Sequence, residues 1–142
     1  PNSRVFVANY CHPLPFVQDV RVAPNPVGTG GILIPSNKRV DGDPPTGIRI
    51  EVVLATRASG TKETPGAVIW VTVFDAVGNV VYGKTQMKLD PDGKALARIW
   101  DGRNKKGSFV AGGTYLARFE GRENNTAATW AGQAKIGIKT TK

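Results

Sequence analysis

The chain has 142 residues, of which 17 are Gly and 10 are Pro, and it carries a formal net charge of +8 at pH 7. This length suits one domain that buries about two thirds of the surface of its unfolded chain. The many Gly, Pro, Val, Ile and Thr residues favour short strands and turns, and they argue against a helical protein.

Charge and cysteine content narrow the classes of partner. The positive charge favours acidic partners, but the basic residues are scattered rather than interleaved with aromatic ones, so we expect no nucleic-acid groove. Cys11 is the only cysteine, which excludes an intramolecular disulfide, and its plain interpretation is a buried or interface thiol. No apolar run approaches the roughly 20 residues of a transmembrane helix, so we expect no membrane insertion.

The N-terminal residues have the features of an extended arm rather than of a core element. Residues 1–19 contain the sequence His-Pro-Leu-Pro, which imposes polyproline-like geometry, and they lead into a strand that ends at Pro24. The apolar side chains in and just after this arm predict an assembly strand, that is, a strand that pairs with the edge of another sheet. The residues of this expected assembly strand are Val5, Phe6, Val7, Phe16, Val20 and Val22.

The middle of the chain predicts three strands. Residues 32–34 follow a glycine-rich turn, and residues 35–47 are expected to form a long polar loop. Residues 48–54 place Arg and Glu opposite an apolar face, which predicts a half-buried strand. Residues 68–74 are apolar except for Thr72, and this pattern predicts a central strand covered on both faces.

The second half of the chain predicts further strands at residues 80–89, 95–99, 115–120 and 130–139. A long turn joins the middle two, and its residues tolerate tight or left-handed backbone between two aromatic anchors. This turn motif consists of Trp100, Asp101, Gly102, Asn104, Gly107, Gly113 and Tyr115.

These elements together predict an all-β fold. We expect an immunoglobulin-like antiparallel β-sandwich of about seven to nine strands over residues 20–142, preceded by the arm at residues 1–19. The sequence lacks the Cys–Trp–Cys pattern of antibody domains.

Two segments carry a family resemblance. Residues 73–81 read Val-Phe-Asp-Ala-Val-Gly-Asn-Val-Val, and residues 100–104 read Trp-Asp-Gly-Arg-Asn, ahead of Gly107, Gly113 and Tyr115. In order and spacing, this resembles the immunoglobulin-like domain of the flagellar hook-cap protein, over about residues 20 to 139. The same fold group includes C-terminal domains of bacterial surface and secreted proteins, among them type IX secretion sorting domains. The resemblance therefore implies a bacterial cell-surface or extracellular location.

Candidate catalytic and metal-binding groups are sparse. His12 is the only histidine and neighbours Cys11 on an extended arm, where adjacent side chains point apart, so the two do not form a catalytic pair. Asp90 and Asp101 each begin a fragment of a calcium-type loop, but neither fragment has an acidic ligand at its far end. We expect no metal, no other cofactor and no enzymatic activity.

The leading functional hypothesis is a non-enzymatic structural module whose partner is another copy or a neighbouring domain of the same parent protein. Strand addition by the arm, repeated head to tail, would build a fibre. One alternative is a C-terminal sorting or accessory domain of a larger secreted protein.

A second alternative is a carbohydrate-binding module. The chain's three Trp residues could offer sugar-stacking rings, although core placement is the plainer interpretation for each of them. The stacking set under this alternative is Trp100, Trp130 and Tyr82.

Overall fold

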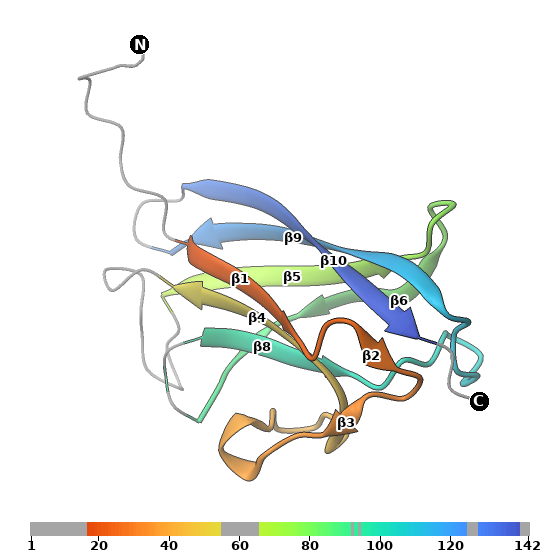
Figure 1. Cartoon of the computed structure of the whole chain (residues 1–142). Helices are drawn as coiled ribbons and strands as arrows, with labels where there is room; N and C mark the ends of the chain where they lie inside the picture. Colours follow the sequence, from red (N-terminus) through yellow and green to blue (C-terminus); the bar gives the residue numbers. More distant parts are fainter. Residues whose placement is uncertain (1–16, 55–65, 92, 94, 125–127, 140–142) are drawn as a thin grey trace.

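A computed structural model describes residues 17–54, 66–91, 93, 95–124 and 128–139, and within them the chain is a β-sandwich without α-helices (Figure 1). The assembly residues Val5, Phe6, Val7 and Phe16 lie outside the described residues. The strands are β1 (Val17–Ala23), β2 (Val27–Gly28), β3 (Ile32–Leu33), β4 (Thr46–Leu54), β5 (Ala67–Phe74), β6 (Val80–Gln86), β7 (Lys88–Leu89), β8 (Ala95–Trp100), β9 (Gly113–Glu123) and β10 (Thr129–Lys139).

Two sheets form the layers. The first sheet has the order β1-β4-β8-β7, with β3 also paired to β4, and the second has the order β2-β10-β9-β5-β6. The described residues contain ten strands, more than the expected seven to nine, and three of them, β2, β3 and β7, have only two residues each. The single strand expected over residues 80–89 is wrong, because the chain passes from the second sheet in β6 to the first in β7. β1 begins at Val17, ahead of the expected boundary at residue 20. The order of the longer strands is compatible with the expected immunoglobulin-like arrangement.

One strand pair corrects the expectation of a wholly antiparallel sandwich. β2 pairs with β10 in parallel, through Val27 opposite Ile138. The chain leaves the first sheet after β1 and joins the second without reversing its direction (Figure 1). The Asn25 side chain binds the connection between β1 and β2 to β10, because it donates to the Lys135 carbonyl and accepts from the Gly137 N–H, both at 2.8 Å.

The main core lies between the two sheets and follows the two-residue period of the strands. Each long strand directs alternate side chains inward, so that apolar groups of both sheets meet. Its most completely buried side chains are Ile48, Ile50, Val52, Ile69, Val71, Val73, Leu96, Trp100, Phe119 and Ile136.

The segment between β3 and β4 is the long, mostly exposed polar loop that the sequence predicts, but it ends earlier than expected because β4 already begins at Thr46. It contains a short 3-10 turn, Ser36–Lys38, and packs on the outer side of the first sheet. Ile34 and Val40 form a second apolar cluster there with Ala97 and Ile99 of β8. The sequence contains enough apolar residues to cover this side of the sheet, but they are spread among Pro, Asn and Asp.

Asp43 fastens the same segment to β8. Its carboxylate accepts the backbone N–H of Ile99 at 2.8 Å and pairs with Arg98 at 2.6 Å. Burial raises the pKa of Asp43, although the Ile99 N–H and the Arg98 charge oppose that shift. These contacts give Asp43 a structural role.

The turn between β8 and β9 is held by its own polar groups. Asp101 accepts the Arg103 N–H at 3.0 Å, and Asn104 accepts the N–H groups of Lys106 and Ser108. Gly102 and Gly107 have φ angles of 81° and 86°, a region that favours glycine. The Asp101 and Asn104 oxygens, in the second of the two calcium-type fragments, therefore accept backbone N–H groups of the turn, whereas the Asp90 carboxylate of the first fragment pairs with Arg49.

Tyr115 fixes the end of this turn, two residues after Gly113, where β9 begins. Its buried ring packs edge-on against Trp100, and its hydroxyl donates to the Ala111 carbonyl at 2.6 Å. Burial, followed by the nearby Asp75 carboxylate, raises the pKa of Tyr115, which keeps the hydroxyl protonated. A tyrosine at the start of this strand that bonds back to the preceding turn is a recurrent device of immunoglobulin-type sandwiches.

Candidate functional site

The sugar-stacking set expected from the sequence does not form a surface. Trp100 is only 1% exposed, and its indole N–H donates to the Arg103 carbonyl at 2.9 Å. Its ring packs against Tyr82, with 6.3 Å between ring centroids. Trp100 therefore cannot stack on a sugar, and Tyr82 uses part of its ring to cover it.

Trp130 also turns inward. Its half-buried ring lies 5.9 Å from that of Phe119, centroid to centroid, and packs against the main core. A Cβ atom added at Gly132 would collide with the indole. The glycine therefore makes room for the ring on the inner side of β10.

The assembly residues that are described lie in β1 and pair within the chain. β1 is antiparallel to β4, with Val20 opposite Val52 and Val22 opposite Ile50. Both valines are half-buried and pack against the main core. This part of the expected assembly strand therefore belongs to its own sandwich.

One side of the second sheet is not covered by any described element. The expectation that β5 is covered on both faces is therefore wrong. Val68, Trp70, Thr72 and Phe74 are half-exposed there, whereas their neighbours along β5 are buried. We call this side the outer face. Residues directly opposite in antiparallel strands share a face, which adds Leu116, Arg118, Glu120 and Arg122 of β9 and Thr129, Ala131, Gln133 and Lys135 of β10.

Trp70 is the largest side chain of the outer face and is held by two charged neighbours. It lies opposite Glu120 of β9 on one side and Gln86 of β6 on the other. The Lys84 ammonium lies 5.3 Å from the centroid of the indole and 3.2 Å from a Glu120 carboxylate oxygen. These contacts orient the indole while leaving part of it in contact with solvent.

A hollow of about 470 Å³ lies beside Trp70. Ala131 keeps its floor low because its side chain is short, whereas the side chains of Trp70 and Arg122 are long. The lining residues are Trp70, Glu120, Gly121, Arg122, Thr129, Trp130 and Ala131.

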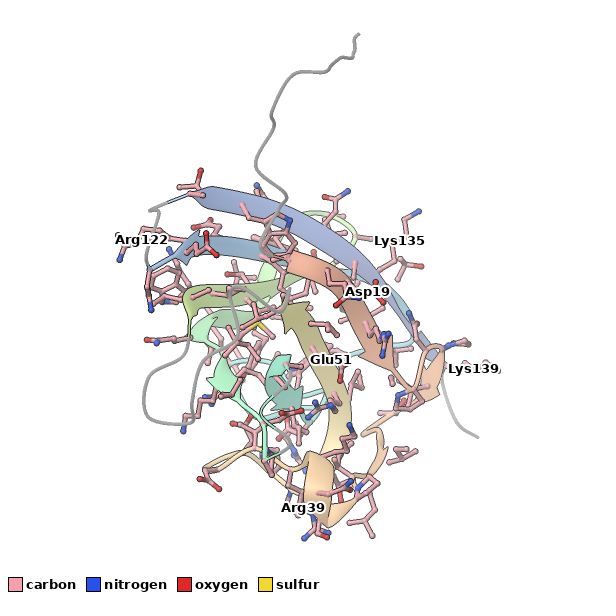
Figure 2. All side chains as sticks on the ribbon, turned by 90° about the vertical axis from the view of Figure 1, so that its left-hand side faces the viewer. Asp19, Arg39, Glu51, Arg122, Lys135 and Lys139 are labelled. Carbon is pink, nitrogen blue, oxygen red and sulfur yellow. The ribbon has the colours of Figure 1, made fainter. Side chains whose placement is uncertain are left out.

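Positive charge predominates on the outer face. Lys84, Arg118, Arg122 and Lys135 contribute four positive charges, against the single negative charge of Glu120. The Arg118 guanidinium lies 5.9 Å from the centroid of the Phe74 ring. Figure 2 shows Arg122 and Lys135 well apart along the second sheet. Arg122 has no ion-pair partner among the described residues.

The first sheet has its own charged cluster, and its charges are already paired. Arg49 donates to Glu51 and Asp90 at 2.8 Å and to the Lys38 carbonyl at 2.6 Å. Glu51 lies near the β1 side of this sheet, below Asp19 in Figure 2. A groove of about 400 Å³ borders this cluster. These ion pairs connect β4 to the segments that cover it, so we interpret them as structural.

Two further kinds of functional feature, a metal site and a membrane-spanning helix, were sought in the described part of the chain. Within those residues there is no group of three or more His, Cys, Asp and Glu side chains that could hold a metal ion. The described residues also contain no helix that is long and apolar enough to cross a membrane.

The sequence matches no family model and shows no significant similarity to a curated protein. The resemblance to the hook-cap domain therefore stays a prediction.

Proposed function

We propose that the chain is a non-enzymatic accessory module of a larger extracellular or bacterial cell-surface protein, and that it works as a monomeric β-sandwich. Its buried charged groups support this proposal, because Arg49, Asp43 and their partners connect segments of the fold. The resemblance to the hook-cap domain supports the proposed location.

The main support for a monomer comes from the edge strands of the two sheets. Unpaired edges invite strand addition, and proteins blunt them with short strands, bulges and charged side chains. β2 and β7 are edge strands of two residues each. The pairing of β1 and β4 shifts register between Val17 and Asp19, and that of β5 and β6 shifts twice. β6 also carries Lys84 near its middle. β1, β6 and β7 thus each have a feature that disfavours a further strand. At the edge of β10 that β2 leaves open, the Asn25 side chain occupies backbone groups of Lys135 and Gly137, and residues 129–134 pair only with β9 among the described strands.

Fibre formation through the arm is the competing proposal. Val5, Phe6 and Val7 of one copy would pair with an edge of the next, and repetition would produce an open chain of modules. Because β1 already pairs with β4 of its own chain, residues ahead of Val17 would have to supply the added strand.

Light scattering over a wide concentration range separates the two proposals. The accessory module is expected to keep the mass of one chain at every concentration, with or without residues 1–15. A mass that rises with concentration and returns to one chain after the deletion would reject the monomeric module and favour the fibre.

A further inference from the structure

We propose that the hollow beside Trp70 binds an acidic glycan, that is, a polysaccharide whose sugar rings carry carboxylate groups. The inference depends on the outer face of the second sheet and is independent of whether the module is monomeric.

Trp70 supplies the wall against which a sugar ring can stack. Its indole is half-exposed beside a hollow of about 470 Å³, and neighbouring strands fix its direction. The C–H groups of a sugar ring present a flat apolar surface, and a rigid aromatic ring binds such a surface with little loss of side-chain entropy. Lys84 lies over the same indole and strengthens its fixed orientation.

The polar lining of the hollow suits hydroxyl groups, which both donate and accept hydrogen bonds. Glu120 is an acceptor, Arg122 is a donor, and the Thr129 hydroxyl can be either. A purely apolar ligand would leave these groups without partners when it excluded water. The lining therefore favours a ligand with many hydroxyls.

The charges of the outer face favour an acidic glycan over a neutral one. The outer face carries four cations against one carboxylate, so its net field attracts anions. Arg122 can bind a sugar carboxylate through two parallel N–H groups, because the guanidinium fork matches that geometry.

Single-stranded nucleic acid is also a polyanion, but the hollow suits it less well. Nucleic-acid grooves use several stacking rings along a basic track. Here Trp70 is the one lining ring of the hollow that lies on the outer face, because Trp130 packs against the main core, so a second base would have no ring to stack on. Glu120, opposite Trp70, can accept hydrogen bonds from sugar hydroxyls.

Isothermal titration of the whole chain with oligogalacturonate tests the proposal, with a neutral β-glucan oligosaccharide and a single-stranded oligonucleotide for comparison. We expect oligogalacturonate to bind most tightly. Loss of the stacking ring in W70A is expected to weaken this binding by about 5- to 150-fold, the effect of one stacking contact. W70F retains a ring and is expected to bind within a few-fold of the original protein, which separates loss of stacking from loss of fold.

Charge variants provide the matched control. R122Q is expected to weaken oligogalacturonate binding severalfold and to reduce its dependence on salt. K106Q removes the same charge from the turn ahead of β9, roughly 30 Å away by strand length, and is expected to leave binding unchanged. Equal weakening by both variants would show nonspecific attraction and overturn the proposal. Absence of oligogalacturonate binding, or tighter binding of the oligonucleotide, would overturn it as well.

Discussion

Replacing Arg49 with Met is expected to destabilise the sandwich by about 3–5 kcal/mol. The Arg49 side chain is 7% exposed, and its guanidinium lies 2.8 Å from the carboxylates of Glu51 and Asp90. Those carboxylates are 15% and 2% exposed, respectively. Met fills a similar volume but takes away the positive charge, so two carboxylates remain in a poorly solvated place. The Lys38 carbonyl loses a donor at the same time.

Urea denaturation followed by tryptophan fluorescence measures this loss directly, because the urea midpoint falls while the slope of the transition stays constant. Adding D90N to R49M is expected to recover part of the stability, since one of the two charges left without Arg49 is then removed. R21M is the control: Arg21 is 62% exposed and lies 2.9 Å from Asp19 in solvent, so its midpoint should barely change. A loss below about 1 kcal/mol in R49M would show that the Glu51 and Asp90 carboxylates do not need the Arg49 charge in the folded state.

Three further predictions concern the fold. Y115F removes a hydrogen bond from a buried tyrosine to a backbone carbonyl, and it should cost about 1 kcal/mol of unfolding free energy in urea. G47A places a Cβ within 2.5 Å of the β8 backbone and should cost about 1–3 kcal/mol by the same measurement, whereas G83A, in open space, should cost little. D75N should lower the thermal midpoint at neutral pH. N–H donors, chiefly the backbone N–H of Asn79, hold the pKa of Asp75 below its ordinary value of 3.8. The difference in thermal midpoint between D75N and the original protein should therefore disappear as the pH falls through this lowered pKa.

Each of these predictions has an opposing outcome. A Y115F midpoint equal to that of the original protein would mean that water replaces the tyrosine hydroxyl without loss. Equal effects of G47A and G83A would remove the steric argument. A D75N difference that persists well below the lowered pKa of Asp75 would show that the carboxylate charge is not its cause.

Much of the fold could be predicted from the sequence because strand alternation and turn chemistry are local. Alternation placed Ile48, Ile50 and Val52 on one buried face, and the polar residues after Trp100 predicted a long turn. The covering segment over the first sheet could not be predicted in this way. Its contacts join Ile34 and Val40 to residues of β8 far along the chain, and no periodic pattern records such a pairing.

The candidate site was missed for a related reason. An apolar strand such as β5 has the same pattern whether its second face is covered or only half-exposed. Thr72 was the local signal that this face meets water, and it lies two positions from Trp70. The neighbours of Trp70 come from β6 and β9, so the cluster with Lys84 and Glu120 exists only once the sheet order is known.

The most direct test follows the indole N–H signals of the chain's three Trp residues by ¹⁵N NMR during titration with oligogalacturonate. The Trp70 signal is expected to shift and to saturate. The Trp100 signal should stay in place and exchange slowly with solvent, because this indole is buried and donates to a backbone carbonyl. A Trp70 signal that does not move at saturating ligand, or a Trp100 signal that moves instead, would contradict the assignment of the outer face as the binding surface.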